Sequence, residues 1–266
     1  MRELLKVDLK RVFKDTLFLV LMILTVVFAI IGPVLTRALF SLIDMGESIR
    51  DLISAKSLFF KAFSVGSNMG LITPILLTIA ICKDVSHGTI RNKIISGHSR
   101  TSVYLSRFIT ISVYMIGIML FGAFLTLGVS LIFFNYQPEP FEMVDFWYIL
   151  VSVGFYIIAY LLISSILAFL TVSMKGAGLS IVLYIAFVFF FIIVGTITNV
   201  VVALQFDNPN AFLIFLDNAN VFSSSIIGEG NSYTVSELLS LIIPNLLLAG
   251  GLFSLGLLIF NKKDLK

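Results

Sequence analysis

Apolar residues occur in long, nearly continuous runs along this chain, and polar residues gather in the shorter stretches between them. A helix needs about 20 apolar residues to cross the hydrocarbon core of a bilayer. Six runs reach that length, at about 17–36, 60–82, 108–134, 147–173, 178–204 and 237–260. The pattern predicts an all-α integral membrane protein with six transmembrane helices in one domain that covers residues 1–266.

Composition supports this class of protein. Hydrophobic residues make up 59% of the 266 positions, charged residues only 12%, and 26 residues are phenylalanine. A soluble domain of this size cannot bury so much apolar surface. The first apolar run is too long for a cleaved signal peptide and no small-residue cleavage site follows it, so we expect it to remain as the first span.

The distribution of Lys and Arg predicts how the helices are oriented. All but four of these 18 residues fall in the first 15 residues, in 83–107, beside the short turn at Lys175, or in the C-terminal tail; the exceptions are Arg37, Arg50, Lys56 and Lys61. Loops rich in Lys and Arg stay in the cytoplasm. We therefore expect both termini and the 83–107 loop to be cytoplasmic, and we interpret the net charge of +3 as a topology signal, not as a sign of nucleic-acid binding.

Residues 1–15 have the pattern of an amphipathic entry helix. Leu5, Leu9, Val12 and Phe13 share one helical face, and basic residues occupy the others. Such a helix would lie along the inner leaflet before the chain enters the first span. The alternative is that these residues only supply charge next to the membrane.

The polar stretch 83–107 predicts a short helix between two turns. Ile90 and Ile94 are four residues apart on one helical stripe, Gly97 can end the helix in a left-handed conformation, and Ser99 can cap the next helix. We therefore expect a short helix with an apolar stripe on one face and basic residues beside it. A cytoplasmic partner would bind this chain through that helix. The alternative is that the loop only sets the topology.

Two asparagines fall within apolar runs. Asn68 lies between Gly66 and Gly70, a small-residue spacing that permits close approach of two helices. Asn245 interrupts the last run. An amide in lipid more often bonds to a neighbouring helix than to a transported molecule, so both residues are candidates for helix packing or for the translocation path.

The segment 205–236 is expected to be extracellular. Its apolar run from Ala211 to Leu216 lies between two clusters of turn-forming residues and is too short to cross a bilayer. Such a run can dip into the outer leaflet and return if protein covers its backbone.

Motifs for enzyme chemistry are missing from the sequence. It has no G-x-x-x-x-G-K-[ST] loop to hold nucleotide phosphates and no H-E-x-x-H or Ser/His/Asp arrangement. His87 and His98 have no cysteine or acidic cluster beside them, so no metal site is expected. The chain is therefore not expected to be an enzyme or to hold a cofactor.

One stretch of the loop carries a resemblance to a known family. D-V-S-H-G-T-I-R-N-K at 84–93, then S-G-H-S-R at 96–100 and Y-L-S-R at 104–107, resembles the characteristic stretch between spans two and three of ABC-2 type permeases, the transmembrane subunits of bacterial ATP-binding-cassette transporters. The resemblance implies a coupling helix that contacts a separate ATPase subunit, which would bind ATP and Mg²⁺. The implied contact residues are Asp84, Gly88, Thr89, Ile90, Arg91, Asn92, Lys93 and Ile94.

The resemblance implies a function. The chain would be the permease subunit of an exporter in the bacterial cell membrane, would pair with a second permease subunit of the same or another kind, and would move peptides, such as antimicrobial peptides, or other amphipathic or hydrophobic cargo. Two alternatives stay open: a membrane sensor or scaffold that recruits a cytoplasmic partner, and an ion-coupled secondary carrier. The sequence does not identify the cargo or the permease partner, and it does not decide between export and import.

Overall fold

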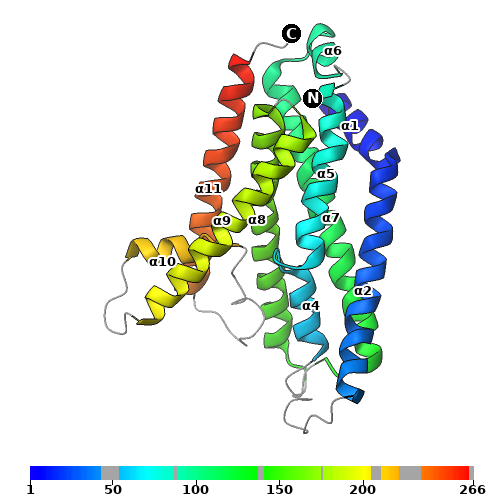
Figure 1. Ribbon diagram of the computed structural model, residues 1–266, viewed down its shortest axis with the longest axis vertical. Coiled ribbons are helices and arrows are strands. Elements are labelled where there is room, and N and C mark those ends of the chain that lie inside the picture. Colours follow the sequence, from blue (N-terminus) through cyan, green and yellow to red (C-terminus); the bar gives the residue numbers. More distant parts are fainter. Residues whose placement is uncertain are drawn as a thin grey trace.

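The computed structural model in Figure 1 describes residues 1–42, 54–86, 89–136, 141–174, 176–204, 211–221 and 235–263. All regular secondary structure in these residues is helical. The helices are α1 (Arg2–Lys14), α2 (Thr16–Leu42), α4 (Ala55–Phe63), α5 (Asn68–Ser86), α6 (Thr89–Ile95), α7 (Arg100–Phe133), α8 (Met143–Ser173), α9 (Ala177–Leu204), α10 (Ala211–Asn218) and α11 (Val235–Lys262).

Five of these helices, α2, α7, α8, α9 and α11, are long and apolar enough to cross a membrane. The chain is therefore a multi-pass membrane protein, and these helices correspond to five of the six predicted runs. The start of α7 differs from the prediction. This helix begins at Arg100 instead of near residue 108, so the end of the predicted polar loop is helical.

The remaining predicted run, 60–82, is not one continuous helix, so a sixth span is not shown. A turn over residues 64–67 separates α4 from α5. The hydroxyl of Ser67 accepts a hydrogen bond from the Gly70 N–H at 3.1 Å and so caps the start of α5. The apolar part of α5, Met69–Lys83, is shorter than the length that a single helix needs to cross a bilayer.

The turn also changes the meaning of the small-residue pattern at Gly66 and Gly70. Gly66 lies in the turn itself. A Cβ atom on Gly70 would lie 2.2 Å from the carbonyl oxygen of Val65. The missing side chain at Gly70 therefore lets the turn pack against α5, and the pattern does not join two spanning helices.

Helix α8 is the interior helix of the bundle. In its most apolar 18-residue stretch, 67% of the residues are buried. In the corresponding stretches of the other four spanning helices, 17–28% are buried. The Tyr160 hydroxyl donates to the Phe63 carbonyl at 2.7 Å, and the Tyr156 hydroxyl donates to the Phe60 carbonyl at 3.4 Å. Tyr160 thus supplies a partner for a carbonyl at the end of α4, whereas the Phe60 carbonyl also accepts the Ser64 N–H at 3.0 Å.

The start of α4 is bonded to the residues that follow α7 and to α8. The backbone N–H groups of Ala55 and Lys56 donate to the carbonyls of Asn135 and Tyr136 at 2.9 and 3.0 Å. The Lys56 ammonium lies 3.6 Å from the Asp145 carboxylate, and both side chains are largely buried. Both ends of α4 are thus held by other helices.

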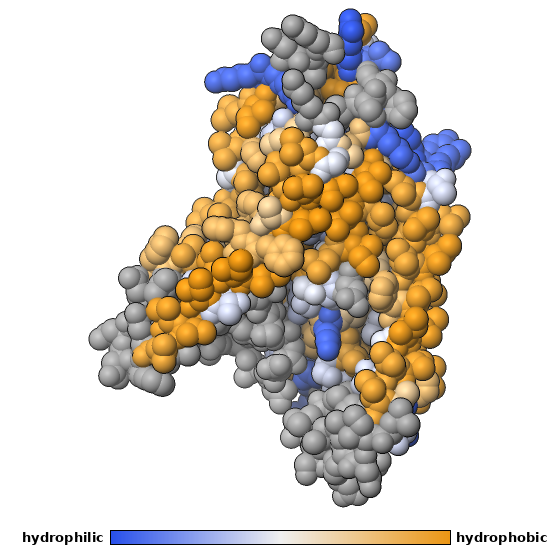
Figure 2. All heavy atoms as spheres, viewed as in Figure 1, coloured by the Kyte–Doolittle hydropathy of each residue, from blue (hydrophilic) through white to orange (hydrophobic). Residues whose placement is uncertain are grey.

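One end of the bundle is polar. The start of α1, the helix α6 and the end of α11 lie at the same end of the molecule (Figure 1). Hydrophilic residues gather at this polar end, whereas hydrophobic residues cover the sides of the bundle (Figure 2). The start of α1 and the end of α11 therefore lie on the same side of the bundle, as the charge pattern predicts. That this side faces the cytoplasm stays a prediction.

Part of the segment 205–236 lies within the described residues. Its apolar run forms α10, a two-turn helix that packs against α9 and α11. The rest of the segment lies outside the described residues, except for 219–221 and the first two residues of α11.

Candidate coupling site at the polar end

The short helix α6 forms for the local reasons that the sequence indicates. Gly97, which follows it, has a φ angle of +93° and donates its N–H to the Ile94 carbonyl at 3.0 Å, as at many helix ends. The Ser99 hydroxyl accepts the Ser102 N–H at 3.2 Å and caps α7. The predicted helix, its end and the following cap are all confirmed.

The apolar stripe of α6 faces the protein's own bundle. Ile90 is buried, and Ile94 is partly buried and packs against the same core. The outward side presents Arg91, Asn92 and Ile95, and Ile95 is 72% exposed. A partner at this end would therefore meet these three side chains and not the Ile90 stripe.

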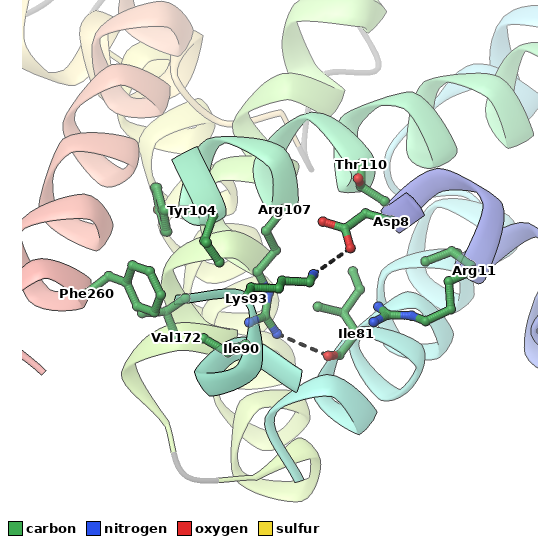
Figure 3. Close-up of a pocket in the computed structure, with 12 residues that line it drawn as sticks. Asp8, Arg11, Ile81, Ile90, Lys93, Tyr104, Arg107, Thr110, Val172 and Phe260 are labelled. Carbon is green, nitrogen blue, oxygen red and sulfur yellow. Dashed lines mark hydrogen bonds and ion pairs between the residues drawn. The ribbon is translucent and has the colours of Figure 1, made fainter. Parts of the chain in front are cut away.

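Lys93 also points inward and joins α6 to α1. Its Nζ donates to Oδ1 of Asp8 at 2.5 Å (Figure 3). The Ser106 hydroxyl of α7 donates to Oδ2 of the same carboxylate at 2.8 Å. The side chains of Lys93 and Asp8 are only 17% and 5% exposed. One buried carboxylate thus holds three helices together.

The sequence pattern does not indicate the role of Asp8, because it predicts a different apolar face for α1. The buried residues of α1 are Leu4, Asp8 and Val12. Phe13, which was expected on the apolar face, is 65% exposed. The helix is therefore rotated relative to the prediction. The signal that was overlooked is the position of an acidic residue four places from Leu4 and from Val12.

Three further bonds tie α1, α5 and α7 together. The Arg107 guanidinium donates to the Ile81 carbonyl at 3.2 Å (Figure 3), and the Tyr114 hydroxyl donates to the Leu9 carbonyl at 2.6 Å. The Lys83 ammonium at the end of α5 lies 2.9 Å from both carboxylate oxygens of Asp15. Displacement of α6 would therefore act on several helices at once.

Asp15 lies at the junction of α1 and α2. Burial by itself would raise its pKa, but the Leu17 N–H and the Lys83 ammonium stabilise the ionised carboxylate, and the net result is a lowered pKa. The ion pair is therefore present at neutral pH.

The end of α11 is attached to the same region. The Arg100 guanidinium donates to the carbonyls of Asn261 and Lys263 at 2.7 and 2.8 Å, and the Lys263 ammonium donates to the Val172 carbonyl at 2.5 Å. These cations bind the carbonyls that helices leave without partners at their C-terminal ends.

The remaining candidate residues of the loop divide into two groups. Thr89 is half-buried and begins α6. Asp84 lies in the last turn of α5, but its side chain is outside the described part of the chain, as is the whole of Gly88.

Of the two candidate asparagines, Asn245 serves in helix packing. It is fully buried, and its amide nitrogen donates to the carbonyls of Asn218 at 3.0 Å and Leu241 at 2.7 Å. It thereby joins α11 to the end of α10. Asn68 is the first residue of α5, and its side chain lies outside the described residues.

The polar end has no room for a small-molecule substrate at the contact between α1, α6 and α7. The cavity between Asp8, Ile90, Tyr104 and Arg107 holds about 20 Å³, enough for about one water molecule. Within the part of the chain that the structure describes, no three His, Cys, Asp or Glu side chains are placed to hold a metal ion.

No known protein family, characterised protein or solved structure matches this chain. The functional assignment therefore depends on the residues and their geometry.

Proposed function

We propose that this chain is the transmembrane permease subunit of an ATP-binding-cassette exporter and that a separate ATPase subunit binds the outward side of α6. The observation that supports the proposal is the division of α6 into two sides. Arg91, Asn92 and Ile95 are exposed, whereas Ile90 and Lys93 are fixed to neighbouring helices. A helix that is free on one side and bound on the other can pass a movement inward.

The proposed mechanism uses these contacts. Closure of two ATPase subunits around ATP pushes α6, and the push reaches α1 through the bond between Lys93 and Asp8 and reaches α7 through the bond between Ser106 and Asp8. The spanning helices then rearrange around the cargo path, and ATP hydrolysis resets them. Two permease subunits would enclose that path, and amphipathic peptides are the proposed cargo.

The test begins with partner recovery. The chain is purified in mild detergent after co-expression with the proteins encoded beside it, and the retained proteins are identified. We expect an ATPase subunit to remain bound and to be lost with the Arg91→Glu variant, because the charge reversal places a carboxylate on the exposed side of α6. Lys6→Glu is the matched control, because Lys6 is also exposed and basic but lies on α1.

The choice of Arg91 alone follows from the geometry. Reversal of Lys93 as well would place a second carboxylate beside Asp8, so a failure to fold would be confused with a failure to bind. If Arg91→Glu retains the ATPase subunit and transports normally, the proposed contact is wrong. A partner without nucleotide-binding activity would favour the scaffold instead, and cargo flux that follows an ion gradient without ATP would favour a carrier.

A further inference from the structure

An apolar groove lies where α1 meets α2 and α7. It has a volume of about 700 Å³ and is lined by Phe13 of α1, Phe18 and Met22 of α2, and Val113 and Phe121 of α7, among others. Val113 and Phe121 are both exposed and eight residues apart, which corresponds to about 12 Å along a helix. The groove therefore runs from the polar end of the molecule along a membrane-spanning helix.

Two lysine side chains lie at the polar end of this groove. Lys10 and Lys14 are one helical turn apart on α1, both are exposed, and both line the groove. Neither has a carboxylate within ion-pair distance among the described residues.

The nearby acidic residues are already bonded elsewhere. Glu3 lies 3.4 Å from the ammonium of Lys6, Asp8 binds Lys93, and Asp15 binds Lys83. Among the described residues, none of these acidic side chains is therefore left to pair with Lys10 or Lys14, and both ammonium groups are placed to bind an external anion.

We propose that this groove holds an anionic phospholipid of the bilayer, with its phosphate between Lys10 and Lys14 and an acyl chain along the apolar floor. Two cations beside an apolar groove match a ligand with a negative headgroup and a hydrocarbon tail. Free phosphate would leave the groove empty, and a zwitterionic lipid would gain little binding energy from the two lysines. Lipid binding can be tested without the proposed transport function, because its assay needs neither cargo nor an ATPase.

The test measures lipid binding to the full-length chain by native mass spectrometry from detergent. Phosphatidylglycerol and phosphatidylcholine with identical acyl chains are compared at equal concentrations. We expect tighter binding of the first phosphatidylglycerol molecule, and each lysine contributes about fivefold to its affinity. The double variant Lys10→Ala/Lys14→Ala should lose about 25-fold in affinity for phosphatidylglycerol. The control Lys6→Ala should keep the preference, because Lys6 does not line the groove.

A second variant tests the apolar part of the groove without changing any charge. Gly117 of α7 lines the groove, and a Cβ atom built on it meets no other atom within 4 Å, so a side chain there would enter the groove without a clash. Gly117→Leu should therefore weaken phosphatidylglycerol binding, because the leucine side chain would occupy the volume that the acyl chain needs. Gly128→Leu is the matched control, because Gly128 is on the same helix, also faces open space, and does not line the groove.

The binding measurements on these variants either support the lipid site or overturn it. Loss of the preference in the double lysine variant together with weaker binding in Gly117→Leu, while both controls bind normally, supports the site. The proposal is overturned by equal affinity for both lipids, by a Gly117→Leu variant that binds like Gly128→Leu, or by glycerol phosphate that binds as tightly as the lipid. It is also overturned if an acidic amphipathic peptide displaces the lipid at a lower concentration, since the groove would then hold a peptide.

Discussion

The bond between Asp8 and Lys93 offers the sharpest test of how the polar end is held together. In the Asp8→Asn variant the side chain keeps its size and one oxygen but loses its negative charge. The Lys93 ammonium then lies in a largely buried position without an anion. We expect α6 to detach from α1 in a fraction of the molecules and the protein to lose stability.

The magnitude follows from how deeply each partner is buried. Removal of one partner from a fully buried ion pair costs about 3–5 kcal/mol, because the other charge stays buried. Lys93 is 17% exposed and belongs to a helix of only seven residues at the end of the bundle, so its ammonium can reach water when α6 moves. The loss is therefore limited to about 1.5–3 kcal/mol, the range for a hydrogen bond to a charged group.

Two measurements check this expectation. Hydrogen–deuterium exchange reports the opening of residues 89–95, and thermal unfolding in detergent reports global stability. Glu3→Gln is the control, since Glu3 also pairs with a lysine on α1, but the two side chains are 60% and 81% exposed and such pairs contribute little. A Lys93→Met change in the Asp8→Asn background should restore part of the loss, because it removes the unpaired charge.

Two results would contradict this role of the ion pair. In one, residues 89–95 of Asp8→Asn exchange no faster than those of Glu3→Gln. In the other, the loss of stability in the double variant with Lys93→Met equals the sum of the losses in the two single variants. Either result would mean that the carboxylate and the ammonium do not stabilise each other in the membrane-embedded protein.

Two further predictions use other parts of the structure. Gly256→Ala should destabilise the protein by about 1–3 kcal/mol in thermal unfolding, because its Cβ would lie 2.1 Å from the hydroxyl of the fully buried Tyr104; Gly250→Ala, whose Cβ meets nothing within 4 Å, is the control and should show no loss. The ion pair of Asp15 with Lys83 should stabilise the protein above the unfolded pKa of the carboxyl, near 3.8, and lose that contribution as pH falls through the lower folded pKa. The difference in melting temperature between wild type and Asp15→Asn should therefore shrink between pH 6 and pH 3, and a constant difference would contradict the assignment.

Local features of the polar end were predictable from the sequence because their causes are local. The end of α6 needs a residue that tolerates a positive φ angle, and glycine supplies it at Gly97. The start of α7 needs a side-chain oxygen at its N-cap, which Ser99 supplies. Five spanning helices were predictable for a similar reason, since the length and hydrophobicity of each run suffice to identify them.

The break between α4 and α5 was not predictable in this way. Hydrophobicity continues through the turn, with Phe63, Val65 and Met69 on either side of Ser67. The turn is stabilised partly from a distance, because Tyr160 of α8 binds the Phe63 carbonyl. Hydropathy also does not separate an interior helix from a lipid-facing one, since lipid tails are as apolar as leucine, and so the central position of α8 was not apparent.

Asp8 was missed because its partner lies 85 residues away in the sequence. On an amphipathic helix at the membrane surface, charged residues are expected to face water or lipid headgroups. Only the position of α6 shows that one of these charges is needed inside the protein. Prediction of the site from the sequence would have required knowledge of which helix packs against which.

The contacts of α1 connect the two proposals physically. One side of this helix binds α6 and α7 through Asp8 and the Leu9 carbonyl, and Lys10 and Lys14 line a groove at its edge. A movement of α6 must therefore either carry α1 with it or break the bond to Lys93. If α1 moves, the two lysines move relative to the apolar residues of α2 and α7 that form the rest of the groove. The affinity for a bound lipid would then depend on the position of α6, and by thermodynamic reciprocity the bound lipid would bias that position.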